Sequence, residues 1–73
     1  MGAVMKGIQT DRIACAIELP GVTSLAPVLL LIDGTYAFDP SLNHSAQKQA
    51  REWVRRCGDR FRNYVAAEGL LDQ

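Results

Sequence analysis

Apolar residues recur at steps of three and four positions through the last part of the chain, from Ala46 onward. At ~100° per residue, these steps place the apolar side chains on one face of a helix. The pattern therefore predicts one amphipathic helix over residues 40–69, with Gly69 as its natural stop. Its predicted apolar face consists of Ala46, Ala50, Trp53, Val54, Cys57, Phe61, Tyr64 and Val65.

The start of this helix and its internal glycine are two local features that the pattern leaves open. The helix can begin at Asp39, which precedes a proline suited to the first helical position, or at a later cap, Asn43 or Ser45. Gly58 lies inside the predicted helix, where glycine costs about 1 kcal/mol relative to alanine. Its missing side chain is expected to permit close approach of another backbone.

Shorter-period patterns predict strands in residues 1–39. Residues 12–19 alternate in the manner of a half-buried strand, and a short helix from Thr10 is the competing interpretation. One side of this strand carries Ile13, Cys15, Ile17 and Leu19. Residues 28–32 are continuously apolar and predict a second strand.

A loop and a tight turn separate the predicted strands. Pro20 breaks the first strand and opens a loop that ends near Pro27. The Asp33-Gly34 pair lies between apolar residues on both sides, which is a strong signal for a β-hairpin. The strand that returns from this turn is expected over residues 35–38.

We therefore expect an α+β fold, in which a small antiparallel sheet of three or four strands is followed by one C-terminal amphipathic helix. Residues 4–9 are the candidate for a fourth strand. The expected single domain, 1–73, consists of a strand region 1–39, the helix 40–69 and a tail 70–73. One helix covers only one face of the sheet, whereas the strand at 28–32 offers apolar side chains to both faces.

The cover of the second sheet face is the main open question of this architecture. A second copy of the chain or a different partner can supply it. The chain itself can also supply it, through the loop residues Val22 and Leu25 or the tail residues Leu70 and Leu71.

Composition supports one folded domain and excludes several classes of protein. The chain has 73 residues, of which 48% are apolar, and its formal net charge is zero. Such a composition argues against disorder and against an arm that is basic throughout. The longest apolar run, residues 28–32, is far shorter than the ~18 residues of a membrane span. With no secretory signal pattern, we expect a cytoplasmic protein, in which Cys15 and Cys57 are reduced, buried and unpaired rather than joined in a disulfide.

The sequence contains little on which catalysis could rest. The single histidine, His44, lies close in sequence to Asp39, Ser41 and Ser45. A catalytic triad needs residues that converge from separate elements, so these residues are better understood as caps and turn formers. No glycine-rich phosphate loop or metal-ligand spacing is present. We expect no enzymatic activity, no catalytic residues, no cofactor and no metal.

Basic residues on the predicted helix are the informative surface feature. Residues 41–73 hold six of the eight basic residues, and five of these six are arginines. Arginine presents a planar charged group suited to carboxylates and phosphates. The predicted partner-binding residues are Lys48, Arg51, Arg55 and Arg62, which share a ~60° stripe at ~100° per residue, and Arg56 and Arg60 on the other flank.

Pairing within the helix is the competing explanation for these charges. Glu52 and Arg56 are spaced for a favourable i,i+4 pair, and Arg55 and Asp59 form a less favourable one. This pairing leaves Lys48, Arg51 and Arg62 without local acids.

A protein partner fits the charge balance better than a nucleic acid does. Dedicated nucleic-acid domains usually have high pI, whereas the pI of this chain is about 6.5. The aromatic residues Trp53, Phe61 and Tyr64 belong to the predicted apolar face and are not free to stack on bases. Protein interfaces, in contrast, enrich arginine and aromatic residues and tolerate net neutrality.

In its size, its short sheet with an arginine-bearing helix and its lack of catalytic groups, the chain resembles small phage-encoded or mobile-element regulators that bind host RNA polymerase. No sequence motif carries this resemblance, and toxin–antitoxin and adaptor proteins share the same description. The resemblance implies a non-enzymatic protein-interaction module that inhibits or redirects bacterial RNA polymerase or another large partner. The alternatives are a nucleic-acid-binding regulator that uses the arginine-rich helix and a homodimer with a structural purpose.

Overall fold

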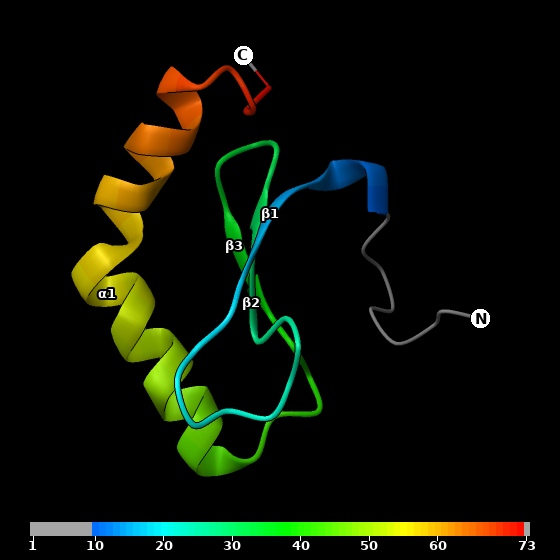
Figure 1. Ribbon diagram of the computed structural model, residues 1–73, viewed down its shortest axis with the longest axis vertical. Coiled ribbons are helices and arrows are strands. Elements are labelled where there is room, and N and C mark those ends of the chain that lie inside the picture. The colour runs from blue at the N-terminus through cyan, green and yellow to red at the C-terminus, as the bar shows by residue number, and fades with distance from the viewer. Residues whose placement is uncertain (1–9, 73) are drawn as a thin grey trace.

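Across residues 10–72, three antiparallel strands and one long helix form the fold (Figure 1). The computed structural model describes residues 10–72, so the predicted strand at 4–9 lies outside the described residues. The strands lie in the order β1-β2-β3 along the sheet. The elements are β1 (Ile13–Ile17), β2 (Val28–Leu31), β3 (Tyr36–Phe38) and α1 (His44–Ala67). The predicted α+β arrangement is confirmed.

Strand β1 departs from the strict alternation that its sequence predicts. A 3-10 turn at Thr10–Arg12 precedes it, so both interpretations of this segment are correct in part. Ile13 lies opposite Leu31, whereas Cys15 lies opposite Leu30, because a bulge shifts the register between them. A bulge adds one residue to one strand, which resets the alternation beyond it. Ile13 therefore shares a face with Leu31 and not with Cys15.

The predicted hairpin at Asp33-Gly34 is confirmed and joins β2 to β3. The Leu31 N–H donates to the Thr35 carbonyl at 2.8 Å. The φ of position 34 is +89°, a value that glycine adopts more readily than residues with a side chain. One Asp33 carboxylate oxygen accepts from the Thr35 N–H at 3.0 Å and from its hydroxyl at 2.6 Å. The Thr35 hydroxyl, followed by its N–H, lowers the pKa of Asp33.

The helix begins later than the earliest predicted start. Asn43 is the N-cap, and its side chain accepts from the Ala46 N–H at 2.8 Å. The alternative start at Asp39 is wrong because its carboxylate is bonded to Ser24 and Ser41 instead. Residues 40–43, which were expected in the helix, form the turn that leads into it.

The helix ends as its glycine predicts. Gly69 has a φ of +79°, and its N–H donates to the Ala66 carbonyl at 3.0 Å. The tail then turns back toward the sheet (Figure 1), where the Asp72 N–H donates to the Ile32 carbonyl at 2.6 Å. Main-chain hydrogen bonding thus ties the end of the helix to the end of β2.

The core lies between α1 and the sheet face that carries Val28. Val28 is buried with Leu19, Leu42 and Ala50, which come from the loops and from α1. Tyr36 of β3 packs against this cluster, and Leu30 lies opposite Tyr36 in the sheet. Opposed residues of neighbouring strands share a face, so Leu30 also faces the helix.

Gly58 provides the close approach that its position predicts, but toward a side chain and not toward a backbone. A Cβ at this position would lie 3.2 Å from Cε2 of Tyr36, and the Tyr36 hydroxyl donates to the Gly58 carbonyl at 2.7 Å. The helix is therefore closest to the sheet along its line of buried residues, which are Ala50, Gly58 and Val65.

Two residues of the predicted apolar face lie outside this contact line. Cys57 is exposed, and Tyr64 retains 63% of its surface. Helix α1 turns Gly58 toward β3, so Cys57 and Tyr64 fall on the flank that the sheet does not cover. Neither Cys15 nor Cys57 forms a disulfide, as predicted, but the prediction that both thiols are buried is wrong.

The two loop residues expected to cover the second face of the sheet, Val22 and Leu25, do not do so. Val22 packs into the core on the helix side, and Leu25 is 83% exposed. In the tail, Leu70 is exposed and Leu71 is half-buried. Val22 and Leu25 are therefore excluded as the cover of the face opposite α1.

Replacing Tyr36 with phenylalanine is expected to lower the free energy of unfolding by about 1 kcal/mol, because the hydrogen bond from the Tyr36 hydroxyl to the Gly58 carbonyl is lost. Burial raises the pKa of the Tyr36 phenol, so the hydroxyl favours its neutral form in the fold. Wild-type stability should therefore fall as pH rises above about 10, where the unfolded chain ionises. Urea denaturation at pH 7 and pH 10.5 measures both effects, and a Tyr64→Phe variant is the exposed control.

Candidate functional site

The structure divides the six predicted partner-binding residues into two groups. Lys48, Arg51, Arg55, Arg56 and Arg60 are exposed on α1, whereas Arg62 is partly buried. Arg62 lies against the hairpin turn, where its Nη1 donates to the Gly34 carbonyl at 3.3 Å. Its position between helix and hairpin gives it a structural contact that the sequence pattern did not predict.

The acidic residues of the helix form different pairs from those predicted. Arg55 donates through Nε and Nη2 to the carboxylate of Glu52, and Arg62 donates through Nη2 to Asp59. Both are i,i+3 pairs, so the predicted i,i+4 pairs of Glu52 with Arg56 and of Arg55 with Asp59 are absent from residues 10–72. The prediction that Arg62 has no local acid is wrong.

This pairing leaves two arginines on one flank of α1 with uncompensated charge. Within the described chain, neither Arg56 nor Arg60 forms an ion pair, and both are exposed. They are one helical turn apart, so their side chains lie on the same flank. Lys48 and Arg51 are likewise unpaired among residues 10–72, but they lie on the opposite flank. We call Arg56 and Arg60 the arginine flank.

An apolar groove runs beside the arginine flank. Its volume is about 310 Å³. One wall comes from residues 19–20, which follow β1, and the other comes from α1. The lining residues are Leu19, Pro20, Gln49, Glu52, Trp53, Arg56 and Cys57. The apolar pattern did not predict this groove because it placed Cys57, which is exposed, on the buried face of the helix. An arginine three positions after a tryptophan was the one signal that could have indicated it.

Aromatic packing holds the tryptophan of the groove in place. The Trp53 ring makes edge-to-face contacts with Tyr36 at 6.0 Å and with Phe61 at 5.7 Å between centroids. Gln49 donates from Nε2 to the Pro20 carbonyl at 2.9 Å, which joins the two walls of the groove. The groove is therefore a preformed feature of the fold.

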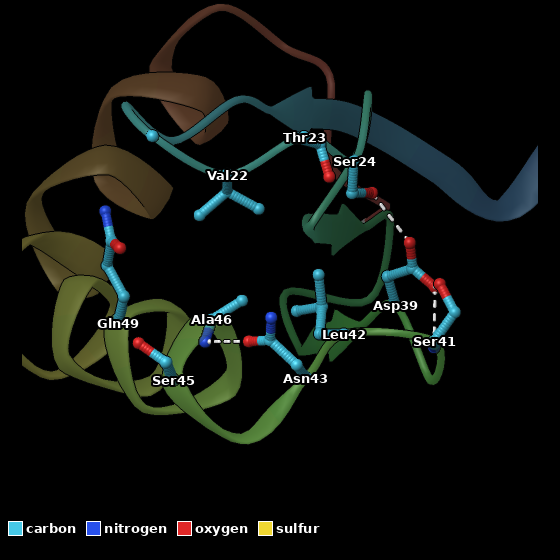
Figure 2. Close-up of a pocket in the computed structure, with 11 residues that line it drawn as sticks. Val22, Thr23, Ser24, Asp39, Ser41, Leu42, Asn43, Ser45, Ala46 and Gln49 are labelled. Carbon is cyan, nitrogen blue, oxygen red and sulfur yellow. Dashed lines mark hydrogen bonds between the residues drawn. The ribbon is translucent and has the colours of Figure 1, made fainter.

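A second pocket lies where the loop meets the start of α1 (Figure 2). It measures about 380 Å³, and Val22 and Leu42 point into it from opposite sides. Ser24 donates its hydroxyl to one oxygen of Asp39 at 2.6 Å. The N–H and hydroxyl of Ser41 donate to the other oxygen at 2.9 and 2.8 Å.

The hydrogen bonds of Asp39 make this cluster a connection between loop and helix. The residue is only 8% exposed, and the Ser24 hydroxyl, followed by the Ser41 N–H and hydroxyl, lowers its pKa. His44 is exposed and does not hydrogen-bond to Asp39. The carboxylate orients two serines and fixes the chain before α1, so the geometry here is that of a structural network.

The described residues also define what the fold can hold. No cluster of three metal-ligating side chains occurs in the part of the chain that the structure describes. Across residues 10–72, no helix combines the length and the apolar character that crossing a bilayer requires.

Comparisons with protein-family models, curated proteins and solved structures return no match to this chain.

Proposed function

We propose that this protein is a non-enzymatic interaction module that binds and modulates a larger protein through the flank of α1. The carrying observation is the juxtaposition of the arginine flank with a preformed apolar groove. Exposed arginines beside a partly exposed tryptophan match the composition of protein-binding surfaces.

Charge complementarity indicates an acidic partner surface. Glu52, the acidic residue in the groove wall, is already paired with Arg55. The net charge presented by this flank therefore comes from Arg56 and Arg60. Carboxylates on a partner would meet two guanidinium groups that have no acid in the described chain.

A protein partner accounts for this flank better than a nucleic acid does. Of the unpaired basic residues, Arg56 lines the groove and Arg60 follows one turn along the same flank, while the chain as a whole is neutral. Two phosphate contacts give a weak, strongly salt-dependent association. The apolar walls would contribute little to a phosphate backbone, whereas they suit an apolar side chain of a protein. Bacterial RNA polymerase is the first large partner to test, because the likeness in size and architecture points to it.

Reversing the charge of the arginine flank in an Arg56→Glu/Arg60→Glu double variant is expected to weaken partner binding by about 30-fold. This figure corresponds to a loss of about 1 kcal/mol for each charge contact. Biolayer interferometry against purified RNA polymerase, and against any acidic protein identified by cross-linking, measures the affinity. Both substituted residues are exposed, so circular dichroism should show an unchanged fold.

A Lys48→Glu/Arg51→Glu variant is the matched control, because it makes the same change of net charge on the opposite flank. The proposal requires this control to bind within about threefold of the wild type at physiological salt, where distant exposed charges are screened. Equal losses in the two variants would contradict a localised site. Steeply salt-dependent DNA or RNA binding that the Arg56/Arg60 variant loses would replace the protein-binding proposal with the nucleic-acid alternative.

A further inference from the structure

We infer that the groove beside the arginine flank binds a short partner segment in which a bulky apolar side chain is adjacent to aspartate or glutamate. This inference rests on the proposed function and adds the chemistry of the segment that is recognised. The apolar side chain enters between Leu19, Trp53 and Cys57, and the carboxylate meets Arg56 at the rim.

The walls of the groove determine the apolar half of this motif. Leu19 and Pro20 form one wall, and Trp53 and Cys57 form the other. A volume of about 310 Å³ leaves room for a bulky side chain. Trp53 is fixed by its aromatic neighbours. Burying the partner side chain against it releases water from both surfaces, which is the main source of affinity in such sites.

The charges at the rim determine the acidic half. Arg56 lines the groove, and Arg60 follows it one turn along the same flank. Glu52 also lines the groove, but its carboxylate oxygens accept from Arg55. A carboxylate on the incoming segment therefore meets Arg56 with its charge uncompensated, whereas an incoming lysine would be repelled.

A synthetic peptide tests the motif directly. The probe is acetylated and amidated, and it carries a leucine–phenylalanine pair flanked on each side by two glutamates. Trp53 is the only tryptophan of the chain and lines the groove, so its fluorescence reports occupancy. We expect a saturable change with the wild type. Replacing the glutamates with lysines, or the apolar pair with two serines, should weaken binding by at least about tenfold.

Substitutions at exposed positions locate the binding site. Cys57→Tyr fills the groove, and Arg56→Glu reverses the rim charge, so each should weaken peptide binding by at least about tenfold. Lys48→Glu, on the opposite flank and outside the groove, leaves the groove open and should retain binding. The inference is overturned if Cys57→Tyr binds the peptide like the wild type, if the serine peptide binds equally well, or if no saturation occurs up to millimolar peptide. Fluorescence that depends on protein concentration without peptide would assign the groove to a second copy of the chain.

The same variants distinguish this inference from the proposed function. If the Arg56→Glu/Arg60→Glu variant loses the protein partner while Cys57→Tyr retains it, the flank binds the partner and the groove does not. If the peptide occupies the groove but the double variant binds every acidic partner normally, the motif is correct and the proposed function fails.

Discussion

Replacing Leu30 with alanine is expected to lower the free energy of unfolding by about 2 to 5 kcal/mol, the range for leucines removed from close-packed cores. Leu30 is 0% exposed and lies opposite Tyr36 on the sheet face covered by α1. Native proteins are stable by about 5 to 15 kcal/mol, so this change removes a large part of the total. Urea denaturation followed by circular dichroism measures the loss.

Leu25 provides the matched control, because it is the same residue type in the same part of the chain. Its side chain is 83% exposed in the loop, so Leu25→Ala should change the free energy of unfolding by less than about 0.5 kcal/mol. Similar losses in the two variants would contradict the described packing of the loop and of β2.

Removing the carboxylate of Asp39 is expected to have the second-largest effect. Asp39→Ala deletes the acceptor for the Ser24 hydroxyl and for both donors of Ser41. Hydrogen bonds to a charged acceptor are stronger than neutral ones, and the partly exposed serines regain some hydrogen bonding to water. We therefore expect a loss of about 2 to 3 kcal/mol in the free energy of unfolding, measured by the same denaturation experiment.

The stability of the wild type should also fall in acid because of this residue. The pKa of Asp39 in the fold lies below its ordinary value of 3.8, so below about pH 5 the unfolded chain binds more protons than the folded chain. The stabilisation is complete well above pH 3.8 and is lost as pH falls through 3.8 and then through the lower pKa of the fold. Asp39→Ala should flatten this acid limb when stability is measured between pH 2.5 and 7.

Asp33→Ala serves as the control for the network, because the pKa of Asp33 is also lowered, but within an exposed turn. Its loss should reduce stability less than Asp39→Ala does, since water replaces the bonds to Thr35. Equal losses would mean that burial of Asp39 adds nothing to its hydrogen bonds.

Local patterns in the sequence determined the elements, because their signals lie within a few residues of one another. The Asp33-Gly34 turn predicts its hairpin since glycine readily takes the positive φ of that turn. Asn43 and Gly69 likewise mark the two ends of the helix, because each forms hydrogen bonds to the chain immediately beside it. For the same reason, the α+β class followed from spacing alone.

The candidate site depended on contacts that no local pattern contains. A helical wheel gives the angle between Cys57 and Gly58 but not which of them faces the sheet, and the bond from Tyr36 to Gly58 decides this. The bulge in β1 is equally invisible to periodicity, because it arises from pairing with β2. Once Gly58 is fixed against β3, Cys57 borders a groove instead of lying in the core, and Trp53 packs against the core with one side while it lines the groove with another.

The sequence by itself determined that α1 carries a basic surface, and only the tertiary structure decided which arginines remain available to a partner. Glu52 has basic neighbours at both i+3 and i+4, so spacing leaves its choice between Arg55 and Arg56 undetermined. The folded helix pairs it with Arg55, and the hairpin turn draws Arg62 toward Gly34. Arg56 and Arg60 are left beside the groove because side-chain pairing is settled by three-dimensional neighbours and not by sequence distance.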